Sequence, residues 1–395
     1  MVEREVVVLS AVRTAIGKFG GGLKDFPPST LAAKVVQEAV QRSGIAPDAI
    51  GHVVFGNVIH TEARDMYLSR VAAVQGGLPV DTPALTLNRL CGSGLQAIVT
   101  AAGMIQTDQC DAAVAGGAEC MSRAPYWLPA MRWGARINDV SAMDVMVAAL
   151  TDPFDNVHMG ITAETVARQF GISRQAQDCL AVESHKRSVA AIAAGRFTEQ
   201  IVPIEVKVKG GSVQFVQDES PRSDTTRESL AKLKPAFSAD GTVTPGNASS
   251  INDGAAAVTL MEAKAAAALG LKPLGRLVDY AVTAVEPNVM GIGPVSAVRK
   301  VMQRSGLSIA DMDVIELNEA FAAQALAVMQ ELQLPADKTN PNGSGISLGH
   351  PLGATGAIVT VKALHELRRI GGRYALVSMC IGGGQGIAAI FESIS

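Results

Sequence analysis

The chain has 395 residues, enough for two or three domains and for a large buried core. Its 34 Lys and Arg nearly balance its 37 Asp and Glu, so the formal charge of -3 gives no global electrostatic reason to expect a nucleic-acid or membrane partner. With 48% hydrophobic residues, 39 glycines and only 4% aromatics, the composition fits helices packed closely on sheets.

The cysteines and the first residues indicate the compartment. Five cysteines show no paired spacing, and an odd number leaves at least one outside any set of disulfides. Met1–Glu5 carries acidic charge and passes directly into Val6–Leu9, which predicts a first strand rather than a signal peptide. No apolar run approaches the ~20 residues that span a bilayer. We therefore expect a cytoplasmic protein.

Short apolar strands and amphipathic helices alternate over the first 121 residues. Pro27–Thr30 is a helix start, and Gly44 after Arg42 and Ser43 is a stop. The elements predicted in this part are a strand at 6–9, a glycine-rich loop at 17–22, a helix ending at Gly44, a strand at 53–55, a helix at about 65–75, a helix after Cys91, and a strand at 112–115 stopped by Gly116 and Gly117.

Residues 122–247 have a different character. Tryptophans, prolines and charges become frequent, a helix is predicted at 173–194, and polar alternation runs through 206–215. A loop-rich segment between two regular halves is typical of an insertion that carries binding residues on a rigid scaffold.

The regular pattern then resumes as a repeat. Gln41–Ile45 is matched by Gln303–Leu307, and each match ends an amphipathic helix and precedes a short strand and an asparagine. The Cys91 stretch corresponds in order to 342–356, and the strand at 112–115 with its glycines to 374–379 with Gly382–Gly384. Alternating α/β units that are too small to be domains alone predict an α/β fold of two duplicated halves, related by a pseudo-twofold axis and sharing buried helices.

Cys91 is the first candidate for chemistry. It precedes small residues and an apolar helical pattern, so we expect it where a loop enters a buried helix. The N–H groups and partial positive charge of a helix N-terminus favour thiolate and can hold an oxyanion. A cysteine among small apolar residues is more often an inert part of the core. A catalytic role for Cys91 therefore requires that another part of the chain supplies a base.

His350 and Cys380 are the partners that a pseudo-twofold arrangement would bring to Cys91. His350 lies among glycines at 347–356, where an imidazole can take a thiol proton, although it could merely pack a turn. Cys380 precedes three glycines whose N–H groups form a plausible oxyanion site, a phosphate cradle or a tight hairpin. No cluster has the spacing of metal ligands. The remaining histidines that lack such a context, and that we expect on helix or strand surfaces, are His52, His60, His185 and His365.

At these residues the chain resembles the thiolase family, that is, 3-ketoacyl-CoA thiolases and acetyl-CoA acetyltransferases, and it looks closest to the bacterial short-chain β-ketothiolases. The motifs that carry the resemblance are Asn88–Gly94, Asn318–Phe321, Asn342–Gly356 and Cys380–Ala388. It implies the thiolase fold, with layers in the order αβαβα and an inserted loop domain. The implied domains are 1–121 completed by 248–273, a CoA-binding loop domain at 122–247, and 274–395.

The resemblance also implies an activity and roles for single residues. The activity is reversible thiolysis of short-chain 3-ketoacyl-CoA, or Claisen condensation of acetyl-CoA with acyl-CoA, by a ping-pong mechanism. Cys91 would be acylated, His350 would activate it, and Cys380 would move the proton on carbon. One oxyanion site would be His350 with a water held by Asn318, and the other the N–H groups of Cys91 and Gly382.

Further residues are implied to bind the substrate. His158, Met159, Phe237 and Ser249 would line the pantetheine channel, Arg222 and Ser229 would lie near the nucleotide, and Met290 and Phe321 near the acyl group. CoA and acyl-CoA are substrates, no other cofactor or metal is implied, and relatives of this kind are typically tetramers, dimers of dimers.

Two positions depart from the family's pattern: Ser250 stands where glycine is common, and Ile358 where arginine is common. We expect the first to affect the channel shape and the second only helix packing. Two other functions stay open, a condensing enzyme acting on carrier-protein thioesters and a non-catalytic acyl-CoA-binding relative. The sequence does not fix chain length, physiological direction or pathway.

Overall fold

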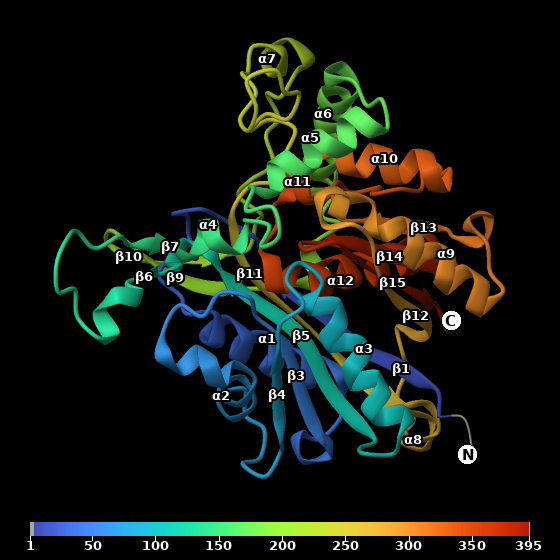
Figure 1. Ribbon diagram of the computed structural model, residues 1–395. Coiled ribbons are helices and arrows are strands. Elements are labelled where there is room, and N and C mark those ends of the chain that lie inside the picture. Colours follow the sequence, from blue (N-terminus) through green and yellow to red (C-terminus); the bar gives the residue numbers. More distant parts are fainter. Residues whose placement is uncertain (1–3, 395) are drawn as a thin grey trace.

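The computed structural model describes residues 4–394, so Met1–Glu3 of the expected acidic start and the last residue of the expected C-terminal half lie outside the described residues. One large sheet organises the chain, in the order β13-β14-β15-β12-β1-β11-β5-β3-β4, with β2 beside β11 and β8 beside β1 (Figure 1). Its strands are β1 (Val6–Thr14), β2 (Gly17–Lys18), β3 (His52–Gly56), β4 (Ala84–Leu87), β5 (Ala112–Cys120), β8 (Ile201–Val202), β11 (Asn252–Glu262), β12 (Gly275–Ala284), β13 (Val314–Leu317), β14 (Tyr374–Ile381) and β15 (Gln385–Glu392).

The two halves of this sheet repeat the same pairing. In the first half β3 runs parallel to β5, which is antiparallel to β11, which is antiparallel to β1. In the second half β13 runs parallel to β14, which is antiparallel to β15, which is antiparallel to β12. A short antiparallel pairing of β1 with β12 joins the halves. The predicted duplication is therefore confirmed.

Helices lie in three layers around the two halves. The helix α1 covers one face of the first half, α3 and α12 lie together between the halves, and α9 covers the far face of the second half (Figure 1). The helices of this core are α1 (Pro28–Ser43), α2 (Leu68–Gln75), α3 (Ser93–Gln106), α8 (Ala263–Ala268), α9 (Gly293–Ser305), α10 (Ala322–Leu332), α11 (Gly345–Leu348) and α12 (Leu352–Ile370). The predicted αβαβα layering is thus confirmed.

Glycines mark equivalent points of the two halves. Gly44 ends α1 with φ 75°, and Gly306 ends α9 with φ 72°, a left-handed conformation that L side chains rarely adopt. At the crossing of the central helices, a Cβ on Gly94 would lie 2.6 Å from the backbone N of Ala357, and a Cβ on Gly356 only 2.3 Å from that of Leu95. The backbones of α3 and α12 therefore touch at two glycines placed reciprocally, as a pseudo-twofold axis requires.

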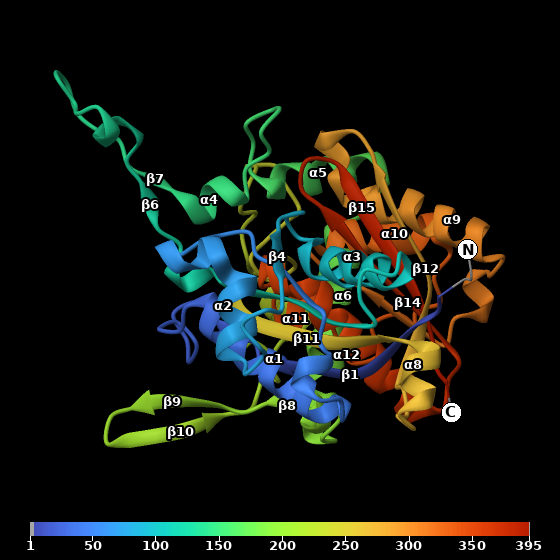
Figure 2. The ribbon, with the colours of Figure 1, turned by 90° about the horizontal axis from the view of Figure 1, so that it is seen from below.

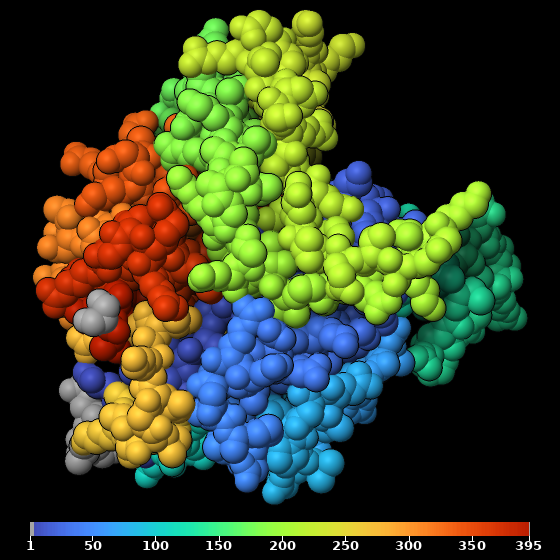
Figure 3. Space-filling view, turned by 180° about the vertical axis from the view of Figure 1, so that it is seen from behind, coloured from blue at the N-terminus to red at the C-terminus, as the bar shows by residue number. Residues whose placement is uncertain are grey.

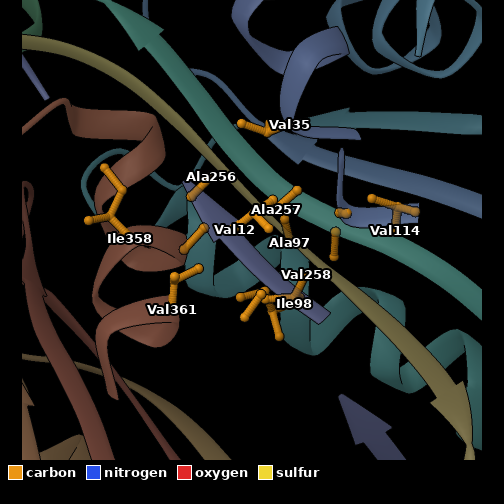
Figure 4. Close-up of a cluster of buried hydrophobic side chains, with 14 of the residues drawn as sticks. Val12, Val35, Ala97, Ile98, Val114, Ala256, Ala257, Val258, Ile358 and Val361 are labelled. Atoms are coloured by element: carbon orange, nitrogen blue, oxygen red, sulfur yellow. The ribbon is translucent and has the colours of Figure 1, made fainter. Parts of the chain in front are cut away.

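The main core fills the space between the sheet and the central helices. Val12 of β1, Ile98 of α3 and Val258 of β11 are fully buried there, with Ile358 and Val361 of α12 beside them (Figure 4). Complete burial of each such side chain stabilises the folded protein by about 1.5–3 kcal/mol. Ile358 is buried in this core, and its expected effect on helix packing alone stays a prediction.

The segment 122–247 covers the surface between the halves. In the view from behind, its yellow-green part lies between the blue first half and the red second half (Figure 3), and the hairpins β6–β7 and β9–β10 project from the body (Figure 2). The helix predicted at 173–194 is confirmed as α6. Besides β8 of the large sheet, the α-helices and strands of this segment are β6 (Tyr126–Trp127), β7 (Met143–Asp144), α4 (Val145–Ala149), α5 (Met159–Gln169), α6 (Arg174–Ala193), β9 (Ile204–Val208), β10 (Gly211–Phe215) and α7 (Arg227–Ala231).

A buried ion pair fastens this segment to the sheet. The guanidinium of Arg13, in β1, donates to both carboxylate oxygens of Asp218, at 2.7 and 2.9 Å, and to Gln200 at 2.7 Å. Arg13 and Asp218 are both fully enclosed. The opposite charge of the partner and these hydrogen bonds replace the water that both side chains lose on burial.

Two local predictions were wrong. The strand at 112–115 does not stop at Gly116 and Gly117 but continues to Cys120, since these glycines make room for neighbouring backbone rather than a turn. A Cβ on either would lie 2.0 Å from a carbonyl oxygen, of Ala256 and Gly353 respectively. They are therefore not the counterparts of Gly382–Gly384, which lie between β14 and β15.

The helix predicted at about 65–75 is confirmed and ends at Gln75, but it is not an α-helix throughout. Its first turn, Ala63–Tyr67, is a 3₁₀ helix whose capping box involves Glu62 and Asp65, and the α-helix begins at Leu68.

The second error concerns His185 and His365, which were expected on the surface. His185 is buried in α6, and His365 has its Nε2 atom 2.9 Å from the carbonyl oxygen of Ala11.

Within residues 4–394, none of the helices has the length and apolarity to cross a membrane.

Candidate active site

Most of the predicted site residues line one cavity of about 290 Å³. It lies where the N-termini of α3, α5 and α12 meet the end of β14. The predicted residues in its lining are Cys91, His158, Met159, Phe237, Ser249, Met290, Phe321, His350, Cys380 and Gly382.

Cys91 stands directly before Gly92, the N-cap of α3, as predicted. It is half-buried, and the preceding Leu90 has a left-handed φ of 45°. Burial raises the pKa of the Cys91 thiol to about 11; the backbone N–H groups of Gly382 and of Cys91 itself lower this pKa in part, and the charge of Glu119 raises it. The helix end thus favours the thiolate as expected, but the loss of hydration outweighs it, and the resting thiol stays protonated at neutral pH.

His350 is held as a neutral base. Its Nδ1 atom lies 2.6 Å from Oγ1 of Thr355, and its backbone N–H donates to Oδ1 of Asn252 at 3.0 Å. The Nε2 atom is buried without a hydrogen-bond partner among the described residues. Burial lowers the pKa of His350 to about 4, so the imidazole is uncharged at neutral pH. It can accept a proton at a cavity wall that also carries Cys91.

Cys380 is at the end of β14, paired with Gly386 of β15, and is almost fully buried. Burial raises the pKa of its thiol strongly, and the neighbouring Cys91 raises it further. Gly382 lies just beyond, close enough to Met159 that a Cβ would approach its Cε atom to 3.1 Å. The Cys380 thiol is therefore protonated at neutral pH and has a proton that it can donate to a group in the cavity.

Asn318, at the end of β13, does not line the cavity. It is fully buried, and neither its Oδ1 nor its Nδ2 atom has a hydrogen-bond partner in the part of the chain that the structure describes. Few buried amides in native proteins are left unpaired in this way. Asn318 and Nε2 of His350 are thus two polar groups available to an oxygen atom of a substrate or of water.

Aromatic and apolar side chains form the other walls. The rings of His158 and Phe237 are stacked with centroids 4.7 Å apart, and Phe237 meets Phe321 edge-on at 6.3 Å. Met159 and Met290 are buried beside them in one cluster. Such a wall suits an apolar ligand, with few polar contacts to fix its orientation.

The match to known proteins covers nearly the whole chain. The model of the N-terminal domain of thiolases matches residues 6–264, and that of the C-terminal domain matches 271–393. The chain belongs to the thiolase family. It is 61% identical over 392 residues to the β-ketothiolase BktB of Cupriavidus necator, covering 99% of this chain and 100% of that protein.

Solved thiolase structures superpose closely on this thiolase. Acetyl-CoA acetyltransferase of Bacillus anthracis has a TM-score of 0.97 at 46% identity, with 99% of each chain covered. Human mitochondrial 3-ketoacyl-CoA thiolase in complex with CoA has a TM-score of 0.96 at 44% identity, covering 99% of this chain and 98% of that one. The resemblance inferred from the motifs, and the thiolase fold, are confirmed.

Arg222 and Ser229 lie away from the cavity of this thiolase. Both are exposed. The backbone N–H of Arg222 donates to Nδ1 of His185 at 3.1 Å, and Ser229 shares a capping box with Thr226 at the start of α7. Their expected place near the nucleotide of CoA stays a prediction.

Part of the cavity lining was not predicted as site residues. Most of these side chains are apolar neighbours of motif residues and carried no signal of their own. Ser250 had one, as a departure from the family pattern, and its hydroxyl lies 2.8 Å from Oδ1 of Asn252. The additional lining residues are Leu90, Met121, Ala149, Leu150, Ala248, Ser250, Ile251, Ala320 and Leu352.

Among residues 4–394, no group of three or more His, Cys, Asp or Glu side chains could hold a metal ion.

Proposed function

We propose that this thiolase transfers acyl groups by a ping-pong mechanism, in two half-reactions through Cys91. As a member of the family related to β-ketothiolases, it is an enzyme of reversible thiolysis and Claisen condensation. Its proposed substrates are acetyl-CoA and short-chain 3-ketoacyl-CoA. The observation that carries this proposal is the presence of Cys91, His350 and Cys380, from three separate segments, in the lining of one cavity.

In thiolysis, the Cys91 sulfur attacks the 3-keto carbonyl while its proton passes to Nε2 of His350. The pKa of Cys91 is about 11 and that of His350 about 4, so the resting pair is neutral and the proton moves as the sulfur attacks. The oxyanion is assigned to the N–H groups of Cys91 and Gly382, and their effect of lowering the pKa of the Cys91 thiol supports this assignment.

The carbon–carbon bond then breaks. The C2–C3 electron pair leaves as the enolate of acetyl-CoA, and the proton of Cys380 goes to its carbon. The enolate oxygen is assigned to His350 and a water held by Asn318. Free CoA gives its thiol proton to the Cys380 thiolate and attacks acyl-Cys91. The shortened acyl-CoA is released, and the proton held by His350 returns to the sulfur of Cys91. Condensation is the reverse, with Cys380 removing the proton from the acetyl methyl group.

The experiment is a thiolysis assay. Addition of CoA to enzyme and acetoacetyl-CoA should remove the absorbance of the acetoacetyl-CoA enolate, and an unchanged absorbance with intact Cys91 contradicts the proposal. Rates with 3-ketovaleryl-CoA and longer substrates then give the chain-length preference. Met159, Met290 and Phe321 support a short acyl group, since all three are buried in the cavity wall.

CoA is assigned to the face carried by the proposed loop domain, 122–247. The pantetheine would pass His158, Phe237 and Ser249, and the nucleotide would lie near Arg222 and Ser229. The proposed core halves are 1–121 with 248–273, and 274–395. The CoA complex of the human relative supports a CoA site on this fold. No cofactor besides the CoA substrates enters the proposed reaction.

The hairpin β6–β7 and the loop between its strands support a homotetramer, a dimer of dimers. Trp133 is 93% exposed, and Met131 and Ile137 are exposed beside it, on an arm that projects from the body (Figure 2). Exposed apolar side chains gathered in this way mark protein contacts. A Trp133→Glu variant should form smaller assemblies than the unaltered enzyme in analytical ultracentrifugation, and an unchanged mass contradicts this contact.

The cytoplasm is the proposed compartment. All five cysteines, which lie in the described part of the chain, are free, as a reducing environment maintains them. The bacterial source of the 61% identical relative agrees with this assignment.

A further inference from the structure

The backbones of β5 and of the start of α12 lie so close together that there is no room for a side chain at the two glycines where they meet. Gly117 and Glu119 are two residues apart on this strand and therefore share one face of the sheet. A Cβ on Gly117 would lie 2.0 Å from the carbonyl oxygen of Gly353, and a Cβ on Gly353 would lie 2.7 Å from Oε2 of Glu119. The segment that follows His350 thus rests directly on β5.

The carboxylate of Glu119 accepts four hydrogen bonds at this contact. Its Oε1 atom accepts from Nδ2 of Asn57 and from the backbone N–H of Ile59, both at 3.0 Å. Its Oε2 atom accepts from the N–H of Val58 at 3.0 Å and of Gly353 at 2.8 Å. Burial raises the pKa of Glu119 to about 7, and the N–H groups of Ile59, Gly353 and Val58 oppose this rise. Because all four partners are donors, the geometry fits the ionised acceptor.

These four donors come from both halves of the fold. Asn57, Val58 and Ile59 follow β3 of the first half, whereas Gly353 is in the first turn of α12, three residues after His350. A carboxylate at this helix end is favoured by the free N–H groups and by the helix dipole.

The same contact forms part of the cavity wall. Ile59 packs in one cluster with Met121 and Leu352, which line the cavity, and with Cys91. The loop and the helix start that Glu119 joins therefore both contribute to the cluster against which the nucleophile packs.

We propose that Glu119 is a positioning residue of the reaction, which sets the placement of His350 relative to Cys91 by binding the N-terminus of α12 to the loop 57–59. The inference rests on the proposed function, because it assigns His350 and Cys91 as base and nucleophile. The carboxylate also has an electrostatic effect on the nucleophile, since its charge raises the pKa of Cys91. Placement and charge can be separated by experiment.

Three variants separate them. Glu119→Gln removes the charge and presents an NH₂ group to N–H donors. Glu119→Asp keeps the charge but is too short to reach both the loop and Gly353. Asp65→Asn is the matched control, because Asp65 is also fully buried and accepts from the N–H groups of Thr61 and Glu62, at 2.8 and 3.1 Å. No hydrogen bond joins Asp65 to α12 among the described residues.

The readouts are kcat and KM in acetoacetyl-CoA thiolysis, and the pH dependence of Cys91 alkylation by iodoacetamide, followed by mass spectrometry. Glu119→Gln and Glu119→Asp should each lose kcat by roughly 100-fold with KM within about threefold, since a shift of about 1 Å in a catalytic group has this effect. The alkylation midpoint should move to lower pH in Glu119→Gln alone. Asp65→Asn should keep kcat and the midpoint.

Full kcat in both Glu119 variants, or an equal loss in Asp65→Asn, overturns the positioning role. If Glu119→Gln does not fold, kcat of Glu119→Asp alone tests the positioning role: a loss of kcat supports it, and an unchanged kcat overturns it. A wild-type enzyme without thiolysis activity would contradict the proposed function instead, and the alkylation profile then still tests Glu119: an unshifted midpoint in folded Glu119→Gln removes its assigned effect on Cys91.

Discussion

Nδ1 of His350 and Oγ1 of Thr355 lie 2.6 Å apart, and the same hydroxyl donates to the carbonyl oxygen of Pro351 at 2.9 Å. Because a hydroxyl has one proton, Oγ1 must accept from Nδ1–H. The lone pair of the neutral imidazole is then on Nε2, the atom without a partner among the described residues. Thr355 thus fixes the tautomer in which His350 can take the proton of Cys91.

Replacement of this hydroxyl should lower kcat. In Thr355→Val the shape is kept but the acceptor for Nδ1–H is lost, so the ring can rotate or change tautomer. We expect kcat of thiolysis to fall roughly 10- to 100-fold, by analogy with the loss of other groups that orient a functional histidine. Thr355→Ser, which keeps the hydroxyl, is the control and should retain most activity. Equal rates in both variants would contradict the assignment.

The two cysteines should fail at different steps. Cys91→Ser should prevent formation of the acyl-enzyme, because a serine hydroxyl is a far weaker nucleophile than a thiol. Cys380→Ala should still allow acylation of Cys91 by acetyl-CoA but stop condensation, since the carbon-bound proton has no acceptor. Intact-mass measurement after incubation with acetyl-CoA separates the two. If Cys91→Ser and Cys380→Ala form the acyl-enzyme to the same extent, the separate roles assigned to the two cysteines are wrong.

Much of the fold and of the cavity could be predicted because local signals repeat. Gly44 and Gly306 end equivalent helices, and the duplication they indicate brings Cys91 and His350 together from distant parts of the chain. Residues could be assigned to the cavity where a motif names them. The ionisation states of these residues could not be predicted from the sequence, since the pKa of Cys91 depends on burial by segments far away in the sequence.

The errors have the same origin. Gly116 and Gly117 have the composition of a turn, and only the tertiary contacts with Ala256 and Gly353 show that they make room inside a strand. Glu119 carried no signal, because its donors are mostly backbone N–H groups, which any sequence supplies. Arg222 is exposed and does not line the cavity, and its place near the nucleotide of CoA stays a prediction.

The buried neutral state of His350 should make stability depend on pH. Its pKa is lowered from 6.5 to about 4, so between these values the unfolded chain binds a proton that the folded chain does not. Stability should therefore fall as pH drops through this window and no further below it. At pH 5 the loss relative to pH 8 is about 2 kcal/mol for this one residue.

Urea unfolding at pH 8 and pH 5 measures this loss. His350→Asn should show a smaller decrease between the two pH values than the unaltered enzyme. His185, whose pKa burial also lowers to about 4, should keep part of the dependence in that variant. His60→Asn, at an exposed position, is the control for the chemical change. An identical decrease in His350→Asn and the unaltered enzyme would rule out the neutral buried imidazole.

The crossing of the central helices gives a stability test with a control on the same helix. In Gly94→Ala the new Cβ would lie 2.6 Å from the backbone N of Ala357, so α3 and α12 must move apart. Overpacking of this kind costs about 1–3 kcal/mol. In Gly103→Ala nothing lies within 4 Å of the new Cβ, and alanine should stabilise the helix by up to ~1 kcal/mol. Denaturation midpoints should therefore move in opposite directions, and a shift of the same sign in both would mean that the backbones do not touch at Gly94.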